Sequence, residues 1–139
     1  MSETSRRDFV RQAASALVAG TLAGCGRAHA APAPANILSF DVGALTADGQ
    51  SRVEPEHGPD GAPILVVREA ANDFRAFSMQ CTHEGCPLNP PAAGKLTCPC
   101  HGSQFDLAGN VLKGPAAYPL GQYHTRYDEK EKRLTVVFG

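Results

Sequence analysis

The sequence has almost no net charge, no internal repeat and no apolar run of transmembrane length. Its 13 Lys and Arg residues nearly balance 14 Asp and Glu residues, and the formal net charge is −1. Without a basic patch, the chain lacks the electrostatic footprint of a nucleic-acid-binding protein. An apolar run at residues 13–24 is about a dozen residues long, whereas a helix needs about 20 to span a bilayer core. The function must therefore be sought in the motifs.

Short apolar runs separated by turn residues indicate an all-β fold. The domain that contains them starts near residue 37 and has about 100 residues, enough for one small core. No helix is expected after residue 25, and short strands at regular spacing are typical of an antiparallel β sandwich or barrel. The expected strands are residues 37–42, 50–54, 64–68, 74–79, 95–97, 104–106, 111–113, 122–127 and 133–138.

Two short stretches each combine a cysteine and a histidine at a spacing that suits metal binding. The first contains Cys81 and His83, and the second contains Cys98 and His101. A Cys2His2 set also holds structural zinc, so a zinc-stabilised binding module is one alternative. However, zinc fingers place their cysteine pair and their histidine pair separately, whereas each pair here is mixed. The mixed pairs favour a different metal group.

Each stretch also carries a further cysteine, Cys86 in the first and Cys100 in the second, which a zinc site leaves unexplained. The doubled pattern resembles the Rieske iron–sulfur family, in which two Cys thiolates hold one iron of a 2Fe–2S cluster and two His imidazoles hold the other. The resemblance implies that the two Cys–His pairs are the metal ligands. Because neutral imidazole removes negative charge from the site, such clusters have higher reduction potentials than all-Cys clusters.

The resemblance extends over the whole domain and implies its architecture. Cys86 and Cys100 occupy the positions that form a disulfide between the two cluster loops in high-potential Rieske proteins. An antiparallel β base would carry a small inserted cluster-binding subdomain, here residues 80–120. The Pro-rich segment 114–120, which contains Pro115, resembles a third loop that covers the cluster.

Three residues beside the expected ligands match the family. Gly85 and Gly102 lie where the backbone passes close to the cluster or turns with positive φ, which glycine does at little cost. Ser103 matches a serine whose hydroxyl bonds a bridging sulfide of the cluster. Because hydrogen bonds to sulfur stabilise the reduced state, this hydroxyl is expected to raise the potential.

Two residues depart from the respiratory members of the family. Phe105 stands where those members usually have a tyrosine that donates to a cluster cysteine. Glu84 stands where they usually have leucine, at the apolar tip that docks onto cytochrome b. Phenylalanine cannot donate a hydrogen bond, and a carboxylate beside His83 adds negative charge, so both departures predict a lower potential. Burying the carboxylate of Glu84 at a docking interface without a partner would also cost free energy. Glu84 therefore argues against a quinol-oxidising role.

The first 25 residues are expected to be an export signal. Arg6 and Arg7 lie just before the apolar run, and together they resemble a twin-arginine signal, which is read by the twin-arginine export machinery. The apolar run has the length of a signal-peptide apolar region.

Three ways of processing this signal remain open. Residues 22–25 resemble a lipobox, in which Cys25 would become a lipidated N-terminus, and residues 28–30 resemble an ordinary cleavage site. A retained membrane anchor is the third. Residues 26–36, rich in Ala and Pro, are expected to be a tether, followed by the domain at 37–139. The protein would then lie in the periplasm or on the extracytoplasmic face of the membrane.

Three functions follow from these expectations. The first is an exported one-electron carrier that does no bond chemistry alone and depends on partner cytochromes or oxidoreductases. The second is the iron–sulfur subunit of a quinol–cytochrome c reductase or of a periplasmic oxidase complex. The third is the zinc-stabilised module. Tyr118, Tyr123 and Tyr127 are expected to pack rather than to relay electrons, and no residue is expected to be catalytic.

Overall fold

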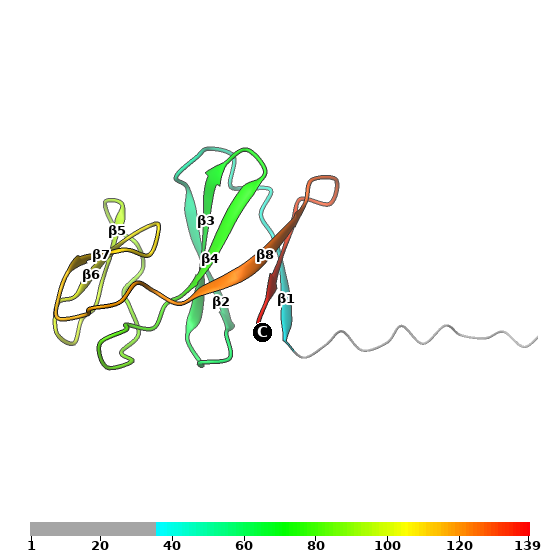
Figure 1. Cartoon of the computed structure of the whole chain (residues 1–139). Coiled ribbons are helices and arrows are strands. Elements are labelled where there is room, and N and C mark those ends of the chain that lie inside the picture. Colours follow the sequence, from blue (N-terminus) through cyan, green and yellow to red (C-terminus); the bar gives the residue numbers. More distant parts are fainter. Residues whose placement is uncertain (1–35) are drawn as a thin grey trace, which may run out of the picture. The chain divides into compact units, whose positions relative to one another are not determined.

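The computed structural model describes residues 36–139, and the expectations for residues 1–35, including Cys25, lie outside the described residues (Figure 1). Nine strands and no helix occur between residues 36 and 139, as the all-β prediction requires. No helix in this part of the chain is long and apolar enough to cross a membrane. The strands are β1 (Ile37–Asp41), β2 (Ser51–His57), β3 (Pro63–Ala70), β4 (Asp73–Ser78), β5 (Lys95–Thr97), β6 (Gln104–Asp106), β7 (Val111–Lys113), β8 (Gln122–Asp128) and β9 (Arg133–Val137).

Six strands form the base of the domain, in the order β1-β9-β8-β4-β3-β2, and every pair of neighbours is antiparallel. The remaining three, β5-β6-β7, form a small sheet inserted between β4 and β8, and Figure 1 shows it beside the base. The insertion begins directly after β4, so the end of a base strand leads straight into the segment that holds the Cys and His motifs.

The hairpin of β3 and β4 separates two hydrophobic cores. In β3, Ile64 and Val66 belong to the core of the base, whereas Leu65 and Val67 belong to a second core shared with the insertion. Because successive side chains of a strand point to opposite faces, a strand buried on both faces becomes a continuous apolar run. This arrangement explains why all four side chains, at most 3% exposed, are apolar.

The strand ends agree with the predictions to within two residues, and those of β5, β6 and β7 agree in full, except at β2. We expected this strand to end at residue 54, but it continues to His57 with an irregularity after Glu54. Pro55 lies in this extension. Since β2 is an edge strand, a residue without an N–H leaves no partner unpaired there.

Candidate metal centre

The first site loop, residues 81–86, follows β4 and is closed by two backbone hydrogen bonds. The amide of Cys81 donates to the carbonyl of Cys86 at 2.8 Å, and the amide of Gly85 donates to the carbonyl of Cys81 at 2.9 Å. Gly85 has a φ of 76°, a conformation that a residue with a Cβ adopts at a cost. The glycine therefore makes the tight return that brings both ends of the loop together.

The second site loop, residues 98–103, joins β5 to β6 and repeats this geometry. The amide of Cys98 donates to the carbonyl of Ser103 at 2.8 Å, and the amide of Gly102 donates to the carbonyl of Cys98 at 3.0 Å. Gly102 also has a φ of 76°. The cysteines that open the two loops, Cys81 and Cys98, therefore hold equivalent positions.

The two expected thiol ligands are buried. Cys81 and Cys98 are free cysteines, each 2% exposed, and they pack in the second core with Leu96 and Phe105. Anionic thiolates need compensation when they are removed from water. A bound cation would supply it, and soft sulfur suits iron.

The two expected imidazole ligands are exposed. The rings of His83 and His101 lie 5.0 Å apart between centroids, nearly perpendicular to each other. Within residues 36–139, the candidate ligand atoms form two groups, His83 with Glu84 and His101, and Cys98 with Cys86 and Cys100. A single tetrahedral ion needs all its ligands around one point. Cys81 belongs to neither group, and Cys86 and Cys100 are bonded to each other, so the four expected ligands do not converge on one point. A two-iron group held by two thiolates and two imidazoles would fit this arrangement better than one ion.

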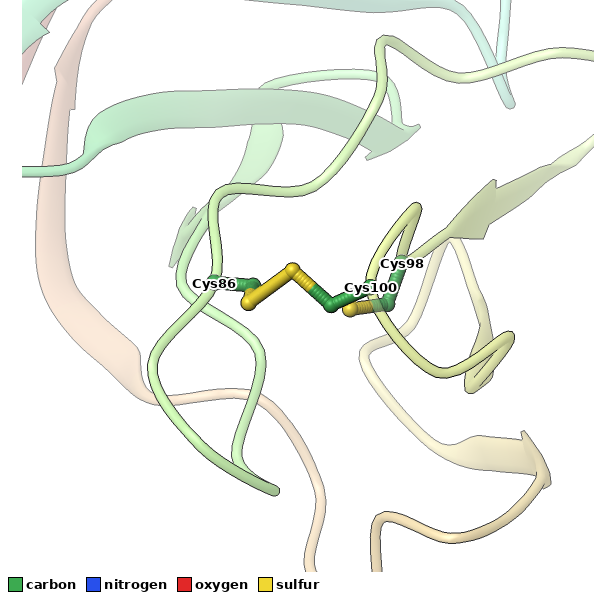
Figure 2. Close-up of side chains that lie close together, drawn as sticks. All are labelled: Cys86, Cys98 and Cys100. Carbon is green, nitrogen blue, oxygen red and sulfur yellow. A yellow bond between two sulfur atoms is a disulfide. The ribbon is translucent and has the colours of Figure 1, made fainter.

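A disulfide joins the two site loops. Cys86 of the first loop and Cys100 of the second are bonded, with their Cα atoms 6.5 Å apart (Figure 2). This is the pair that the resemblance implies. Figure 2 also shows Cys98 beside the disulfide, and its sulfur lies within 4.8 Å of both disulfide sulfurs.

A third loop, residues 114–120, is attached to both site loops. The hydroxyl of Thr82 donates to the carbonyl of Tyr118 at 2.6 Å, and the amide of Ala116 donates to Ser103 Oγ at 3.0 Å. The peptide between Gly114 and Pro115 is cis. The sequence analysis missed the role of Thr82, although its position between the first cysteine and histidine of the motif could have suggested one.

The hydroxyl of Ser103 accepts a hydrogen bond but donates none within residues 36–139. Its side chain is fully buried, and among residues 36–139 its only side-chain hydrogen bond is the one that it accepts from Ala116. A buried hydroxyl normally also donates. This unused donor next to Cys98 fits the presence of an acceptor such as a cluster sulfide.

Glu84 and Tyr118 lie on the exposed part of the site. The carboxylate of Glu84 is 3.7 Å from Nε2 of His101, so the acid of the first loop faces the imidazole of the second. Its side chain is 60% exposed, which spares it the cost of burial. The packing predicted for Tyr118 is wrong, because 71% of this residue is exposed. Tyr123 and Tyr127 do pack, against Phe138 and Phe74 respectively.

A polar network fixes the start of the first site loop. Asp60 accepts hydrogen bonds from the hydroxyls of Ser78 and Tyr123 and from the amide of Ala62, and Ser78 Oγ accepts the amide of Gln80. Burial, together with the negative charge of Asp60, raises the pKa of Tyr123, and the neighbouring Ser78 opposes this shift in part. Because Gln80 directly precedes Cys81, the network holds the strand end from which the ligand loop departs.

Comparison with known proteins gives a consistent result. Residues 47–124 match the family described as the Rieske 2Fe-2S domain. The cytochrome b6-f complex iron-sulfur subunit of Nostoc punctiforme is 41% identical over 83 residues, which cover 56% of this chain and 45% of that protein. The chain thus spans about half the length of the curated relatives that it matches.

Two solved structures share both fold and sequence with this chain. The plasma membrane Rieske protein PetC3 from Synechocystis PCC 6803 is 36% identical with a TM-score of 0.52, covering 60% of this chain and 83% of that one. A chain of a hyperthermophilic respiratory Complex III is 25% identical with a TM-score of 0.53, and the match covers 69% of this chain and 71% of that one.

Proposed function

Because this chain belongs to the Rieske 2Fe-2S domain family and carries one 2Fe–2S cluster, we propose that it passes single electrons between redox partner proteins. The observation that supports this most directly is the pair of buried thiols behind a pair of exposed imidazoles. Cys81 and Cys98 would hold the inner iron, and His83 and His101 the outer one. When bound, the cluster takes up and releases one electron at a potential raised by imidazole ligation.

The residues around this site have distinct tasks in the proposal. The disulfide and the third loop hold the two ligand loops in place, and the buried core keeps water from the thiolate side. The exposed imidazoles form the face that a partner reaches.

A second candidate is a subunit of a larger oxidoreductase. Two of the relatives named above are a cytochrome b6-f complex iron-sulfur subunit and a chain of a respiratory Complex III. Two residues favour the separate carrier over the quinol-oxidising subunit. Glu84 places a carboxylate on the exposed face, and Phe105 withholds a hydrogen bond that would raise the potential.

We also propose that the protein is exported. In this proposal, residues 1–25 form a twin-arginine signal, Cys25 is lipidated, residues 26–36 are a tether and residues 37–139 are the functional domain. The disulfide supports export, because such bonds persist in oxidising compartments and are rare in the cytosol. Mass spectrometry of the mature protein tests this: a diacylglyceryl group on Cys25 is expected, and an N-terminus at residue 31 would overturn the lipidation.

Electron paramagnetic resonance of the reduced, purified protein tests the carrier proposal. The expected result is a two-iron signal with the low average g value of mixed His and Cys ligation, together with two irons per chain. The separate substitutions Cys81→Ser and His83→Ala should abolish the signal, whereas His57→Ala and His124→Ala, on exposed positions of the base, should leave it intact. A colourless protein with one zinc per chain would instead establish the zinc-stabilised module.

Purification and reconstitution distinguish the carrier proposal from the second candidate, a subunit of a larger complex. A carrier is expected to purify alone from gently solubilised membranes and to exchange electrons with an added cytochrome c. If the protein remains bound to a membrane cytochrome and oxidises quinol only in that assembly, the carrier proposal is wrong and the second candidate is correct.

A further inference from the structure

Three sulfur atoms at the site can exchange bonds without any added oxidant. Cys98 Sγ lies within 4.8 Å of the sulfurs of Cys86 and Cys100, which are joined as the disulfide (Figure 2). Disulfides rearrange when a thiolate attacks a disulfide sulfur. A free cysteine, its target bond and its leaving group therefore lie together at one end of the molecule.

We propose that Cys98 attacks this disulfide whenever it is not bound to iron, and that the bond then moves to Cys86 and Cys98. The step is balanced: the Cys98–Cys86 bond forms as the Cys86–Cys100 bond breaks, and Cys100 takes up the proton that Cys98 gives up. No electron enters or leaves the protein. The proposal rests on the proposed function only for the statement that iron occupies Cys98 in the working protein.

Attack at Cys86 is favoured over attack at Cys100. A bond between Cys98 and Cys100 would close a small ring around Pro99, whose φ is fixed. A bond between Cys98 and Cys86 instead links the same two loops that the original disulfide links.

The exchange changes which sulfur is accessible. Before it, the two free thiols within residues 36–139, Cys81 and Cys98, are each 2% exposed. After it, Cys81 remains buried and the newly free sulfur belongs to Cys100, an exposed residue. Loss of the cluster would thus convert a buried thiol into an accessible one and leave one cluster ligand blocked. A dithiol reductase that attacks the new bond would restore the site.

Two ligand variants test this whether or not the wild-type protein binds a cluster. Neither Cys81→Ser nor Cys98→Ser retains all four expected ligands, but only Cys81→Ser retains the attacking thiol. Both are kept under nitrogen, where no new disulfide can form by oxidation, and are then treated with a maleimide without unfolding. Apart from any label on Cys25, Cys81→Ser is expected to react rapidly with about one equivalent, and Cys98→Ser with none. Cys98→Ala serves as a second attacker-free variant, and circular dichroism verifies that all three are folded.

Peptide mapping then locates the label. Fragmentation of the peptide bond before Pro99 separates Cys98 from Cys100, so a label on either is assigned directly. We expect the label on Cys100 in Cys81→Ser and in wild-type protein stripped of its cluster by a chelator, and no label on the cluster-loaded wild type. The proposal is overturned if Cys98 stays the free thiol in Cys81→Ser, or if Cys100 is labelled in the attacker-free variants to the same extent as in Cys81→Ser.

Discussion

At the scale of single residues, two buried side chains near the thiols differ in what they can offer a sulfur atom. Phe105 shares a core with Cys81 and Cys98 and presents only carbon and hydrogen. Ser103 is equally buried but retains a hydroxyl proton that nothing else in residues 36–139 accepts. One residue withholds a hydrogen bond and the other supplies one, so the two should affect the reduction potential in opposite ways when changed.

The substitution Phe105→Tyr is expected to raise the reduction potential. A phenol that donates to a thiolate ligand stabilises the more negative, reduced state, by about 1.5–3 kcal/mol for a bond to a charged group. For one electron this is roughly 65–130 mV. Voltammetry of the immobilised protein measures the change, and Phe138→Tyr, in the base, is the control that should leave the potential unmoved. A potential that stays constant or falls in Phe105→Tyr would refute the argument.

Ser103 and Thr82 provide a matched pair, since each hydroxyl bonds the third loop. Ser103→Ala should lower the potential and also destabilise the fold by about 1–3 kcal/mol, because it leaves the Ala116 amide without its partner. Thr82→Val removes only the bond to Tyr118, so it should cost at most about 1 kcal/mol and hardly change the potential. Voltammetry and urea unfolding measure the two effects, and equal potentials in both variants would contradict the role assigned to Ser103.

At the scale of elements, the β3–β4 hairpin connects the base to the metal site. One face of each strand contributes to the core of the base and the other to the core that contains the proposed ligands Cys81 and Cys98. The apolar run of β3 predicted a buried central strand, and the strand positions followed from alternation and turn residues. The existence of two cores did not follow, because periodicity shows that both faces are covered but not what covers each face.

Neighbouring valines of β3 test this division. Val66→Ala opens space in the base core and Val67→Ala in the site core, and each should cost about 1.5–3 kcal/mol of unfolding free energy. Only Val67→Ala should also accelerate cluster loss at urea concentrations below the unfolding transition, since its cavity lies in the core that contains the two thiols. Bleaching of the visible absorbance at a fixed urea concentration measures that rate. Equal rates in the two variants would show that the cores are not independent.

The sequence was enough to pick out the candidate ligand motifs, but it predicted the contacts around them only in part. Cysteine and histidine spacing singled out both loops, because metal ligands on a loop must be close in the chain. The hydrogen bonds of Thr82 and Ala116 join segments more than ten residues apart, and no local pattern reports such contacts. The exposure of Tyr118 was mispredicted for the same reason, as aromatic residues are usually packed unless a loop carries them outward.

At the scale of the whole molecule, one covalent bond joins the two site loops. The disulfide closes a segment with a sequence separation of 14 residues. Replacing both Cys86 and Cys100 with serine should lower the unfolding free energy by about 3 kcal/mol, the value that chain entropy gives for a loop of about 15 residues. Urea unfolding measures it, with dithiothreitol as a second test that should affect the wild type and not the double variant. A loss below about 1 kcal/mol would mean that the third loop alone holds the site together.

The burial of the thiols and the exposure of the imidazoles have a kinetic consequence. Within residues 36–139 the imidazoles form the exposed side of the site, so in the proposed carrier a donor and an acceptor would occupy the same face in turn. Their binding would then be mutually exclusive, and turnover should follow ping-pong kinetics in which an excess of either partner inhibits the other. The protein would then have to leave the first partner, by dissociating or by pivoting away, before it meets the second. The rate of that release would set the upper limit on its rate of electron transfer.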